Sequence, residues 1–429
     1  MTDLDTRIRA EWDTLHSVAI HRSGMEMFFG LLEPYASQNG AIHEHEQLEH
    51  ILKHEFHINV YQMRNQIVKA AERNQELQDI LVKAARETLN VSKNKDEVTF
   101  VTKEFEKKVN ILDSGHYFDI LLLSPHIESE DEGGKRTHHL KITEQQSLSN
   151  ILCLRDQQAV TDKGIFLSRM SKPQRRREPA ITKILWDVLG CDVIHTVKEP
   201  GTFEGGDFIP LKDFALVGVG GSTNQSGIEQ LLKYGLGFDE VGVVHQPNHP
   251  LVPIDTIDPM LDMHLDTYFN IASRSVAVGL KPLLQEAMVD IYTRTGPGEY
   301  EKEDERVDLL SYITGWGFDV VGITTLEQLS YASNFLTVRD GTILSVEVES
   351  DTKDVLGNLQ KKAKEEPERY GALLSQAEKD YEFLKGESEF FPYKREIFQH
   401  GIDAYPLSFK NLTASYGAAH CLTAVLERG

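Results

Sequence analysis

The sequence has few cysteines, a shortage of basic residues and no long apolar run, and each of these features excludes a class of protein. Three of the 429 residues are cysteine. That is too few for a disulfide framework, so we expect a reducing, cytoplasmic setting. No apolar stretch is long enough to span a bilayer. The first residues also lack the basic flank and apolar core of a secretory signal, so we expect no membrane association.

Acidic residues outnumber basic ones, with 67 Asp and Glu against 45 Lys and Arg and a formal charge of -22. Such a charge disfavours nucleic acid or an anionic membrane surface as a partner. It favours encounter with small cations such as guanidinium or amine compounds, although an acidic surface also serves solubility alone. The hydrophobic content of 40% is typical of a globular protein.

Short apolar segments alternate with helical patterns over most of the chain, which indicates an α/β protein. Strands are expected at 15–21 and 57–63. Hairpins are expected around the turns at 162–164 and 339–341, where glycine follows polar residues. A long charged helical stretch covers 351–390.

Residues 64–145 differ from the rest, because helix formers dominate them and helix breakers are few. We interpret this block as an inserted α-helical domain, with a charged, Gly-containing loop over 127–139. The α/β domain then comprises 1–63 and 146–429.

His264 and Asp266 are the first candidate reactive pair. They are two residues apart, so in an extended strand both side chains would point to the same face. A general acid or base beside a carboxylate suits proton transfer. Such pairs are nevertheless more often structural than catalytic.

Three further places offer reactive groups. Asp156 follows a predicted strand, and Cys421 lies in a Gly/Ala-rich loop near the C-terminus. Glu204 and Asp207 enclose two glycines, which permit a tight backbone and the close approach of a ligand. Each place also has a structural interpretation: a capping carboxylate, a small buried thiol or a glycine turn.

A histidine-rich helix is predicted over 41–56. Glu46, His50, His54 and the following His57 recur every three or four residues and could share a face. Histidines at this spacing can converge on a metal. However, the chain has no HExxH motif and no cysteine near this helix. We therefore prefer a solvated helix face, and expect neither a metal nor a cofactor.

Taken together and in this order, four motifs resemble the guanidine-modifying enzymes, and most closely arginine deiminase. They are LRD (154–156), FEGGD (203–207), HLDT (264–267) and GAAHC (417–421). The resemblance implies a five-bladed α/β-propeller of ββαβ units with a helical insert. It also implies a small guanidino substrate, no cofactor, and a cytoplasmic homo-oligomer.

The resemblance assigns a catalytic role to each candidate. Asp156 and Asp266 grip a guanidinium through bidentate, charge-assisted bonds. Cys421 attacks the central carbon as a thiolate and forms a covalent S-amidino intermediate. His264 protonates the departing amine and then activates water. Glu204 orients His264 and favours its charged form.

The end of the site that would hold the rest of the substrate departs from the family pattern. Asn150, Arg175 and Asp207 are expected to contact substrate, but Ser222 and Tyr416 stand where the family usually carries arginines. Losing one charge-assisted contact costs about 1.5 to 3 kcal/mol, roughly ten- to a hundredfold in affinity. A modified, decarboxylated or peptide-borne arginine therefore competes with free arginine as the substrate. An amidinotransferase or a non-catalytic binder of arginine-like ligands remains an alternative.

The thiol itself presents a conflict. Two aspartates near Cys421 should raise its pKa, whereas a bound guanidinium should lower it. We therefore predict that the thiolate forms only when substrate is bound.

Overall fold

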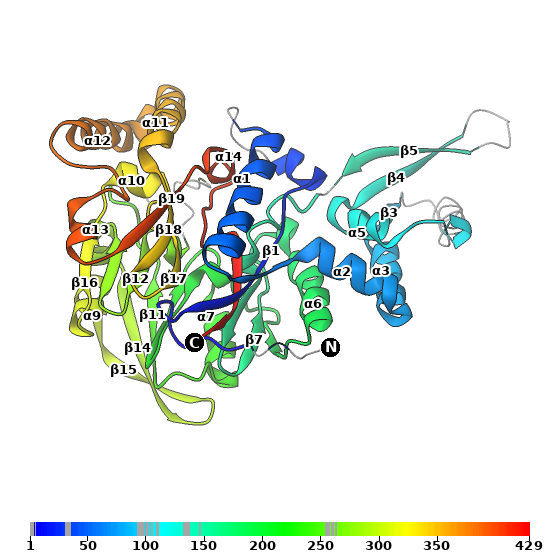
Figure 1. Ribbon diagram of the computed structural model, residues 1–429, viewed down its shortest axis with the longest axis horizontal. Coiled ribbons are helices and arrows are strands. Elements are labelled where there is room, and N and C mark those ends of the chain that lie inside the picture. The colour runs from blue at the N-terminus through cyan, green and yellow to red at the C-terminus, as the bar shows by residue number, and fades with distance from the viewer. Residues whose placement is uncertain are drawn as a thin grey trace.

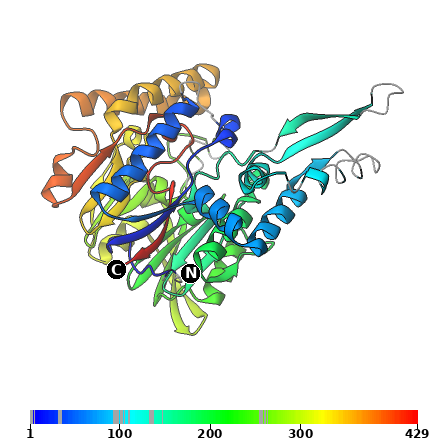
Figure 2. The same cartoon turned by 45° about the vertical axis from the view of Figure 1, so that its right-hand side comes forward.

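The computed structural model describes residues 4, 6–30, 36–91, 99, 103, 106–108, 111–131, 138–145, 147–253, 258, 261 and 264–429. They form a broad α/β body from which one hairpin projects to the side (Figures 1 and 2). The α/β class is therefore confirmed. Among the helices of the described residues we find none that could span a membrane.

Within the described residues, one strand connection occurs five times. Two strands pair antiparallel, and one of them pairs in parallel with a third strand that follows it after one or more helices. In four of the five cases the antiparallel strands are consecutive and form a hairpin. We call each set a ββαβ unit. The first unit combines the two ends of the chain and consists of β20 (Thr423–Arg428), β1 (Leu15–Ile20) and β2 (Asn59–Gln62). The second and third units consist of β6 (Gln158–Thr161), β7 (Gly164–Leu167) and β8 (Val193–Thr196), and of β9 (Phe208–Leu211), β10 (Phe214–Val219) and β11 (Glu240–His245). The fourth and fifth consist of β12 (Phe269–Ser273), β13 (Val276–Gly279) and β16 (Asp319–Gly322), and of β17 (Leu336–Arg339), β18 (Thr342–Val346) and β19 (Asp403–Leu407).

Helices connect the second and third strands of each unit. They are α1 (Gln38–His50) with a π-helix (Ile51–Glu55), α6 (Glu178–Leu189), α7 (Gln225–Tyr234), α8 (Lys281–Glu286) with α9 (Leu309–Gly315), and α11 (Val348–Glu365), α12 (Pro367–Gly386) and α13 (Arg395–Gln399). Between α8 and α9, strands β14 (Met288–Gly296) and β15 (Glu299–Asp308) extend one sheet to five strands. Short helices α10 (Thr325–Leu329) and α14 (Lys410–Thr413) link units.

The units contact one another in a cyclic order. Strand β20 contacts β6, the turns that precede β6 and β9 touch, and the turn before β9 touches the one before β12. Strand β12 in turn contacts β17, and β17 contacts β1. Because β1 pairs with β20, both ends of the chain belong to the same unit. The two termini accordingly lie on the same side of the body in Figures 1 and 2.

The strands form because they are apolar runs that can be buried along their whole length. Every residue of β7, β9, β12, β13 and β18 is buried, as is usual for strands that are covered on both faces. The predicted strands at 15–21 and 57–63 and both predicted hairpins are confirmed.

Residues 64–145 are only partly helical, which corrects the sequence interpretation. Helices α2 (Met63–Arg73), α3 (Gln75–Thr88) and α5 (Ser114–Leu123) are present, but β3 (Asn90–Val91), β4 (Pro125–Asp131) and β5 (His138–Gln145) form a three-stranded sheet. The predicted loop at 127–139 thus contributes to both strands of the projecting hairpin, and its middle, 132–137, lies outside the described residues. Polar and apolar residues alternate in 138–145, which is the strand period.

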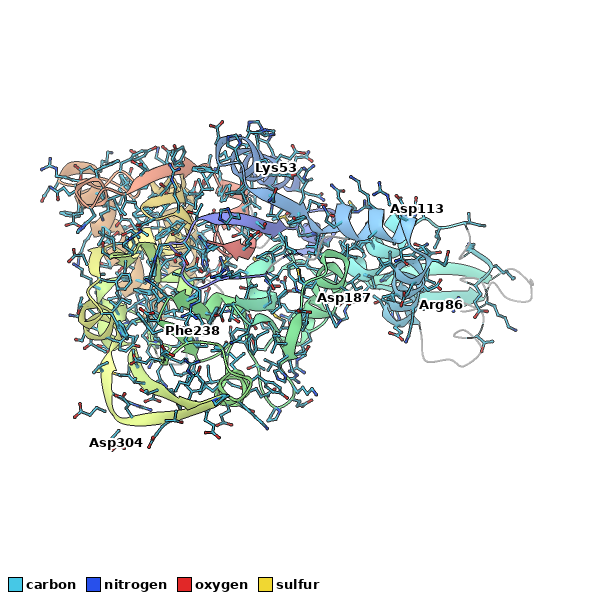
Figure 3. All side chains as sticks on the ribbon, turned by 60° about the horizontal axis from the view of Figure 1, so that its bottom comes forward. Lys53, Arg86, Asp113, Asp187, Phe238 and Asp304 are labelled. Atoms are coloured by element: carbon cyan, nitrogen blue, oxygen red, sulfur yellow. The ribbon has the colours of Figure 1, made fainter. Side chains whose placement is uncertain are left out.

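The histidine-rich helix is α1 with its π-helical extension, and its predicted solvated face is confirmed. Glu46, His50, His54 and His57 are all exposed. Figure 3 places Arg86 and Asp113, on the inserted segment, at one end of the molecule and Asp304, on β15, at the opposite end.

Candidate active site

The predicted site residues lie where the first strands of the units begin. Asp156 precedes β6, Asp207 precedes β9, Asp266 precedes β12 and Cys421 precedes β20, each by no more than three residues. Asn334 occupies the same place ahead of β17. Each of the five units therefore contributes one polar side chain from the entry of its first strand, which explains why the site residues are so far apart in the sequence.

The strand predicted for His264 and Asp266 is wrong. His264 is extended, but Leu265–Thr267 forms a 3-10 helix, and the two side chains diverge toward different partners. The Thr267 hydroxyl donates to the carbonyl of His264 at 2.8 Å, and such local bonds compete with strand formation. Asp156 also lies in a 3-10 helix, Leu154–Gln157, and not at a strand end.

The thiol of Cys421 is buried between an amide and a carboxylate. Asn334 Nδ2 donates to its Sγ at 3.1 Å, and Asp266 Oδ2 lies 3.5 Å from the sulfur. Asn334 Oδ1 accepts the backbone N–H of Ala418 and of Cys421, so this amide also fixes the loop. Burial raises the pKa of Cys421 well above its usual value, and the charges of Asp266 and Asp156 add to that effect. The free enzyme therefore holds a protonated thiol at neutral pH.

His264 and Glu204 form a charged pair. His264 Nε2 lies 3.1 Å from Glu204 Oε2, and its Nδ1 lies 3.6 Å from Asp156 Oδ1. Burial opposes the charged ring, but Asp156, Glu204 and Asp207 raise the pKa of His264 well above its usual value. Burial likewise opposes ionisation of Glu204, yet the hydrogen bond from His264 lowers its pKa to about 2. The His264 side chain is 13% exposed, against 2% for Glu204. Water therefore reaches His264, the proton donor of the pair, more readily than Glu204.

Two buried carboxylate oxygens of this cluster accept no hydrogen bond from the described residues. They are Asp156 Oδ1 and Asp266 Oδ1. Their other oxygens are engaged, Asp156 Oδ2 by Arg175 at 2.9 Å and Asp266 Oδ2 by His420 at 2.8 Å. Buried carboxylate oxygens are costly when they are unsatisfied. A flat cation with several N–H donors is the kind of ligand that would satisfy both.

Arg175 lies among carboxylates. It donates through Nη1 to Asp156 and through Nη2 to Glu178 at 2.9 Å, and Nη1 lies 3.5 Å from Glu204. Asn150 offers its backbone carbonyl to Arg175 Nη2 at 3.4 Å. The arginine thus neutralises the acidic cluster, and direct contacts of Arg175 and Asn150 with substrate stay predictions.

Asp207 ties two loops together. It accepts the hydroxyl of Thr223 at 2.6 Å and the backbone N–H of Leu265 at 3.1 Å. Burial raises the pKa of Asp207 to about 6. Gly206, which precedes Asp207, must be glycine, because a Cβ there would lie 2.7 Å from His264 Nδ1. Asp207 therefore positions His264, and a contact of its own with substrate stays a prediction.

Sequence reasoning missed three participants. Asn334 contacts the sulfur, His420 contacts Asp266, and Glu178 holds Arg175. Asn334 could have been found by aligning the five unit entries, where it takes the place of an aspartate. His420 lies in the GAAHC motif beside Cys421, although the motif was used only for the thiol, and Glu178 is three residues from Arg175 on a helix start.

The donor set of Asp156, Glu204 and His264 could also be considered for a metal, since three ligand atoms lie within 4.8 Å of one another. A metal requires a neutral imidazole, whereas the surrounding carboxylates raise the pKa of His264 well above its usual value. Arg175 moreover already approaches two of the three groups. The set suits an organic cation better than a metal ion.

Comparison with known proteins identifies first the class and then the family. The chain belongs to the pentein superfamily of guanidine-modifying enzymes, which includes hydrolases that act on the C–N bonds of linear amidines. The family model described as arginine deiminase matches residues 29–428. The chain therefore belongs to the arginine deiminase family.

The curated relatives agree with this assignment. Arginine deiminase of Halobacterium salinarum is 25% identical over 99% of this chain and 98% of that enzyme. Arginine deiminase of Limosilactobacillus reuteri is also 25% identical, over 49% of this chain and 54% of that enzyme.

Among solved structures, two share the fold at low identity. The product-bound N-terminal domain of ArgZ, an arginine dihydrolase from cyanobacteria, gives a TM-score of 0.52 at 12% identity, covering 97% of this chain and 98% of that chain. SxtG, an amidinotransferase from Microseira wollei, gives 0.50 at 12% identity, covering 99% and 97%.

Proposed function

We propose that this protein is a cysteine-dependent hydrolase of a guanidino compound, most like arginine deiminase, which converts arginine to citrulline and ammonia. One observation carries the proposal. The Cys421 thiol and the two oxygens of Asp156 and Asp266 that accept no hydrogen bond belong to the same buried, acidic cluster, in a chain of the arginine deiminase family.

The proposed reaction has two halves. Asp156 and Asp266 bind the guanidinium, Cys421 loses its proton to solvent, and its sulfur bonds to the central carbon. His264 gives its proton to the departing nitrogen, the C–N bond breaks, and ammonia leaves. The neutral imidazole then takes a proton from water, whose oxygen attacks the S-amidino carbon. The C–S bond breaks, a ureido product leaves, and the thiolate regains a proton.

We also propose the finer architecture. The five units surround a common axis as a five-bladed α/β-propeller, with residues 64–145 as an insert in the unit of β1 and β2. The cyclic contacts between units and the shared position of the polar residues support this arrangement. A cytoplasmic homo-oligomer without a cofactor completes the proposal, and the three free thiols support a reducing compartment.

A substrate other than free arginine is the second candidate. Ser222 is buried and Tyr416 half-buried where the resemblance leads us to expect arginines, and Arg175 is occupied by Asp156, Glu178 and Glu204. These observations favour a guanidino compound whose far end carries no carboxylate, or whose carboxylate is modified.

A guanidine panel tests the function. Purified enzyme is incubated with free, decarboxylated, N-methylated and peptide-borne arginine, with and without an amine acceptor, and ammonia is measured. We expect ammonia without an acceptor, and loss of turnover by several orders of magnitude in Cys421→Ala. The matched control is Cys191→Ala, which removes another buried thiol, outside the site. Turnover only with an amine would indicate a transferase, and binding without turnover would overturn the enzyme proposal.

A further inference from the structure

A buried chain of polar contacts connects the N-terminal segment to the candidate nucleophile. Asp266 Oδ2, which lies 3.5 Å from Cys421 Sγ, accepts from His420 Nδ1 at 2.8 Å. On the other side of the ring, His420 Nε2 lies 3.5 Å from Glu11 Oε1. Glu11, Asp266 and His420 are each at most 1% exposed. Each ring nitrogen of His420 thus faces a carboxylate, one in the site and one behind it.

Glu11 is fixed by arginines from two units. Arg428 donates to its Oε2 at 2.9 Å, and Arg155 donates to its Oε1 at 3.3 Å. Burial opposes ionisation of Glu11, but these two guanidinium groups hold its pKa well below the usual range. Arg155 also donates to the backbone carbonyls of His420 and Cys421. The N-terminal segment is therefore bound to the loop that carries the thiol.

The titratable and charged groups that face Asp266 come from three segments: His420 and Cys421 from the loop before β20, His264 from its own segment, and Arg155 and Asp156 from the turn before β6. Burial alone would raise the pKa of Asp266, and the hydrogen bond from His420 is foremost among the contacts that lower it. The bond also occupies Oδ2, which leaves Oδ1 for a ligand. Without His420, burial would meet fewer opposing contacts, so the pKa of Asp266 would rise.

We propose that His420 and Glu11 are positioning residues of the active site: His420 holds the carboxylate of Asp266 ionised and correctly turned beside Cys421, and Glu11 holds His420. Asp266 binds the guanidinium, and this assignment rests on the proposed function. The contacts of His420 with Glu11 and Asp266 thus resemble the carboxylate–imidazole contacts that orient ligand-binding groups elsewhere in proteins. Neither residue touches the substrate.

Kinetics test the inference first. In His420→Leu we expect KM for the guanidino substrate to rise roughly tenfold or more at neutral pH, because the carboxylate loses its charge-assisted donor. The acidic limb of the kcat/KM profile should move to higher pH, since Asp266 must then ionise unaided. His420→Gln keeps an amide N–H and should restore most of the affinity. The matched control is His195→Leu. His195 is also buried, but it contacts Gln230, outside the proposed site. This variant should leave the kcat/KM profile unchanged.

A titration of the Cys421 thiol, followed by its ultraviolet thiolate absorbance relative to Cys421→Ala, needs no turnover. In His420→Leu the Asp266 carboxylate loses the hydrogen bond that holds it beside Cys421 Sγ. It can then turn away and repel the thiolate less, so the midpoint should fall relative to the native enzyme. Glu11→Gln should shift it in the same direction by less. If that variant does not fold, Glu11→Asp retracts the carboxylate while keeping its charge for the arginines. If His420→Leu leaves both the thiol midpoint and the kcat/KM profile unchanged, the inference is overturned. If the thiol midpoint shifts but the native protein turns over no guanidine, only the proposed reaction is overturned.

Discussion

The charges around Cys421 oppose its reaction until a cation arrives. Burial, Asp266 and Asp156 all raise the pKa of its thiol, and Asn334 alone among the named contacts lowers it. The same two aspartates are the proposed guanidinium ligands. A bound guanidinium would neutralise the charge that suppresses the thiolate, so substrate binding and activation of the nucleophile become one event.

The thiol titration of the native enzyme tests this coupling. In the free protein we expect the absorbance midpoint of Cys421 well above the range of an ordinary cysteine. With a saturating guanidinium ligand that is not turned over, the midpoint should fall, because one positive charge replaces solvent beside two negative ones. Difference absorbance against Cys421→Ala isolates this thiol from Cys153 and Cys191. A low midpoint in the free protein would show that the thiolate is formed before substrate binds.

At the scale of elements, the 3-10 turns ahead of the first strands determine the site. The turn Gly205–Asp207 packs so closely that a Cβ on Gly205 would lie 2.1 Å from the backbone oxygens of Arg155 and Gln158. A Cβ on Gly206 would lie 2.7 Å from Nδ1 of the His264 ring. Glycine is required here by close approach of neighbouring groups and not by backbone angle, since neither glycine has a positive φ.

Gly206→Ala should therefore displace His264 from its partners. The new methyl group would lie 2.7 Å from Nδ1 of His264 and 3.1 Å from Asp156 Oδ1. We expect kcat to fall roughly a hundredfold, as misplacement by about an ångström does elsewhere, with a smaller effect on the thermal midpoint. The control is Gly357→Ala in α11, where a Cβ meets nothing within 4 Å. It should keep full activity and stabilise the fold by about 0.5 to 1 kcal/mol. Equal activity in both variants would contradict the role given to this turn.

Local signals in the sequence were sufficient for some elements and insufficient for others. The hairpins at 162–164 and 339–341 were predicted because their turn chemistry is local. The conformation at 264–267 was not, because a threonine hydroxyl bonds the preceding backbone and overrides the alternation of side chains. The pairing of β4 with β5 was hidden by helix formers on both sides.

The candidate site followed a similar division. The motif resemblance found Cys421 and His264, which the structure brings into one acidic cluster. Asn334, His420 and Glu11 were not found, because their proximity to the sulfur depends on the repetition of units and on pairing of the two chain ends. No window of consecutive residues contains that information.

At the scale of the whole molecule, the inserted segment shares the core of the body. Ile67, Leu81 and Leu121 belong to the same buried cluster as strand residues of all five units. The ring of Phe118 on α5 lies 6.3 Å from that of His21, just after β1. The sequence predicts that residues 64–145 are inserted into the α/β domain. Their buried side chains nevertheless pack in the core of the body and not in a separate core. We therefore expect it to unfold together with the body.

Phe118→Ala tests that expectation, because it removes a fully buried ring at the seam. Replacing a core phenylalanine by alanine costs about 3 to 5 kcal/mol. If the insert and the body form one cooperative unit, urea should unfold both at one lowered midpoint. All three tryptophans lie outside the insert, at positions 12, 186 and 316, so their fluorescence reports on the body while hydrogen exchange of α3 and α5 reports on the insert. The matched control, Ile80→Ala, removes a side chain that is 42% exposed and should change stability by about 0.5 kcal/mol or less. Early exchange of α3 and α5 with unchanged tryptophan fluorescence and enzyme activity would show instead that the insert folds independently of the active site.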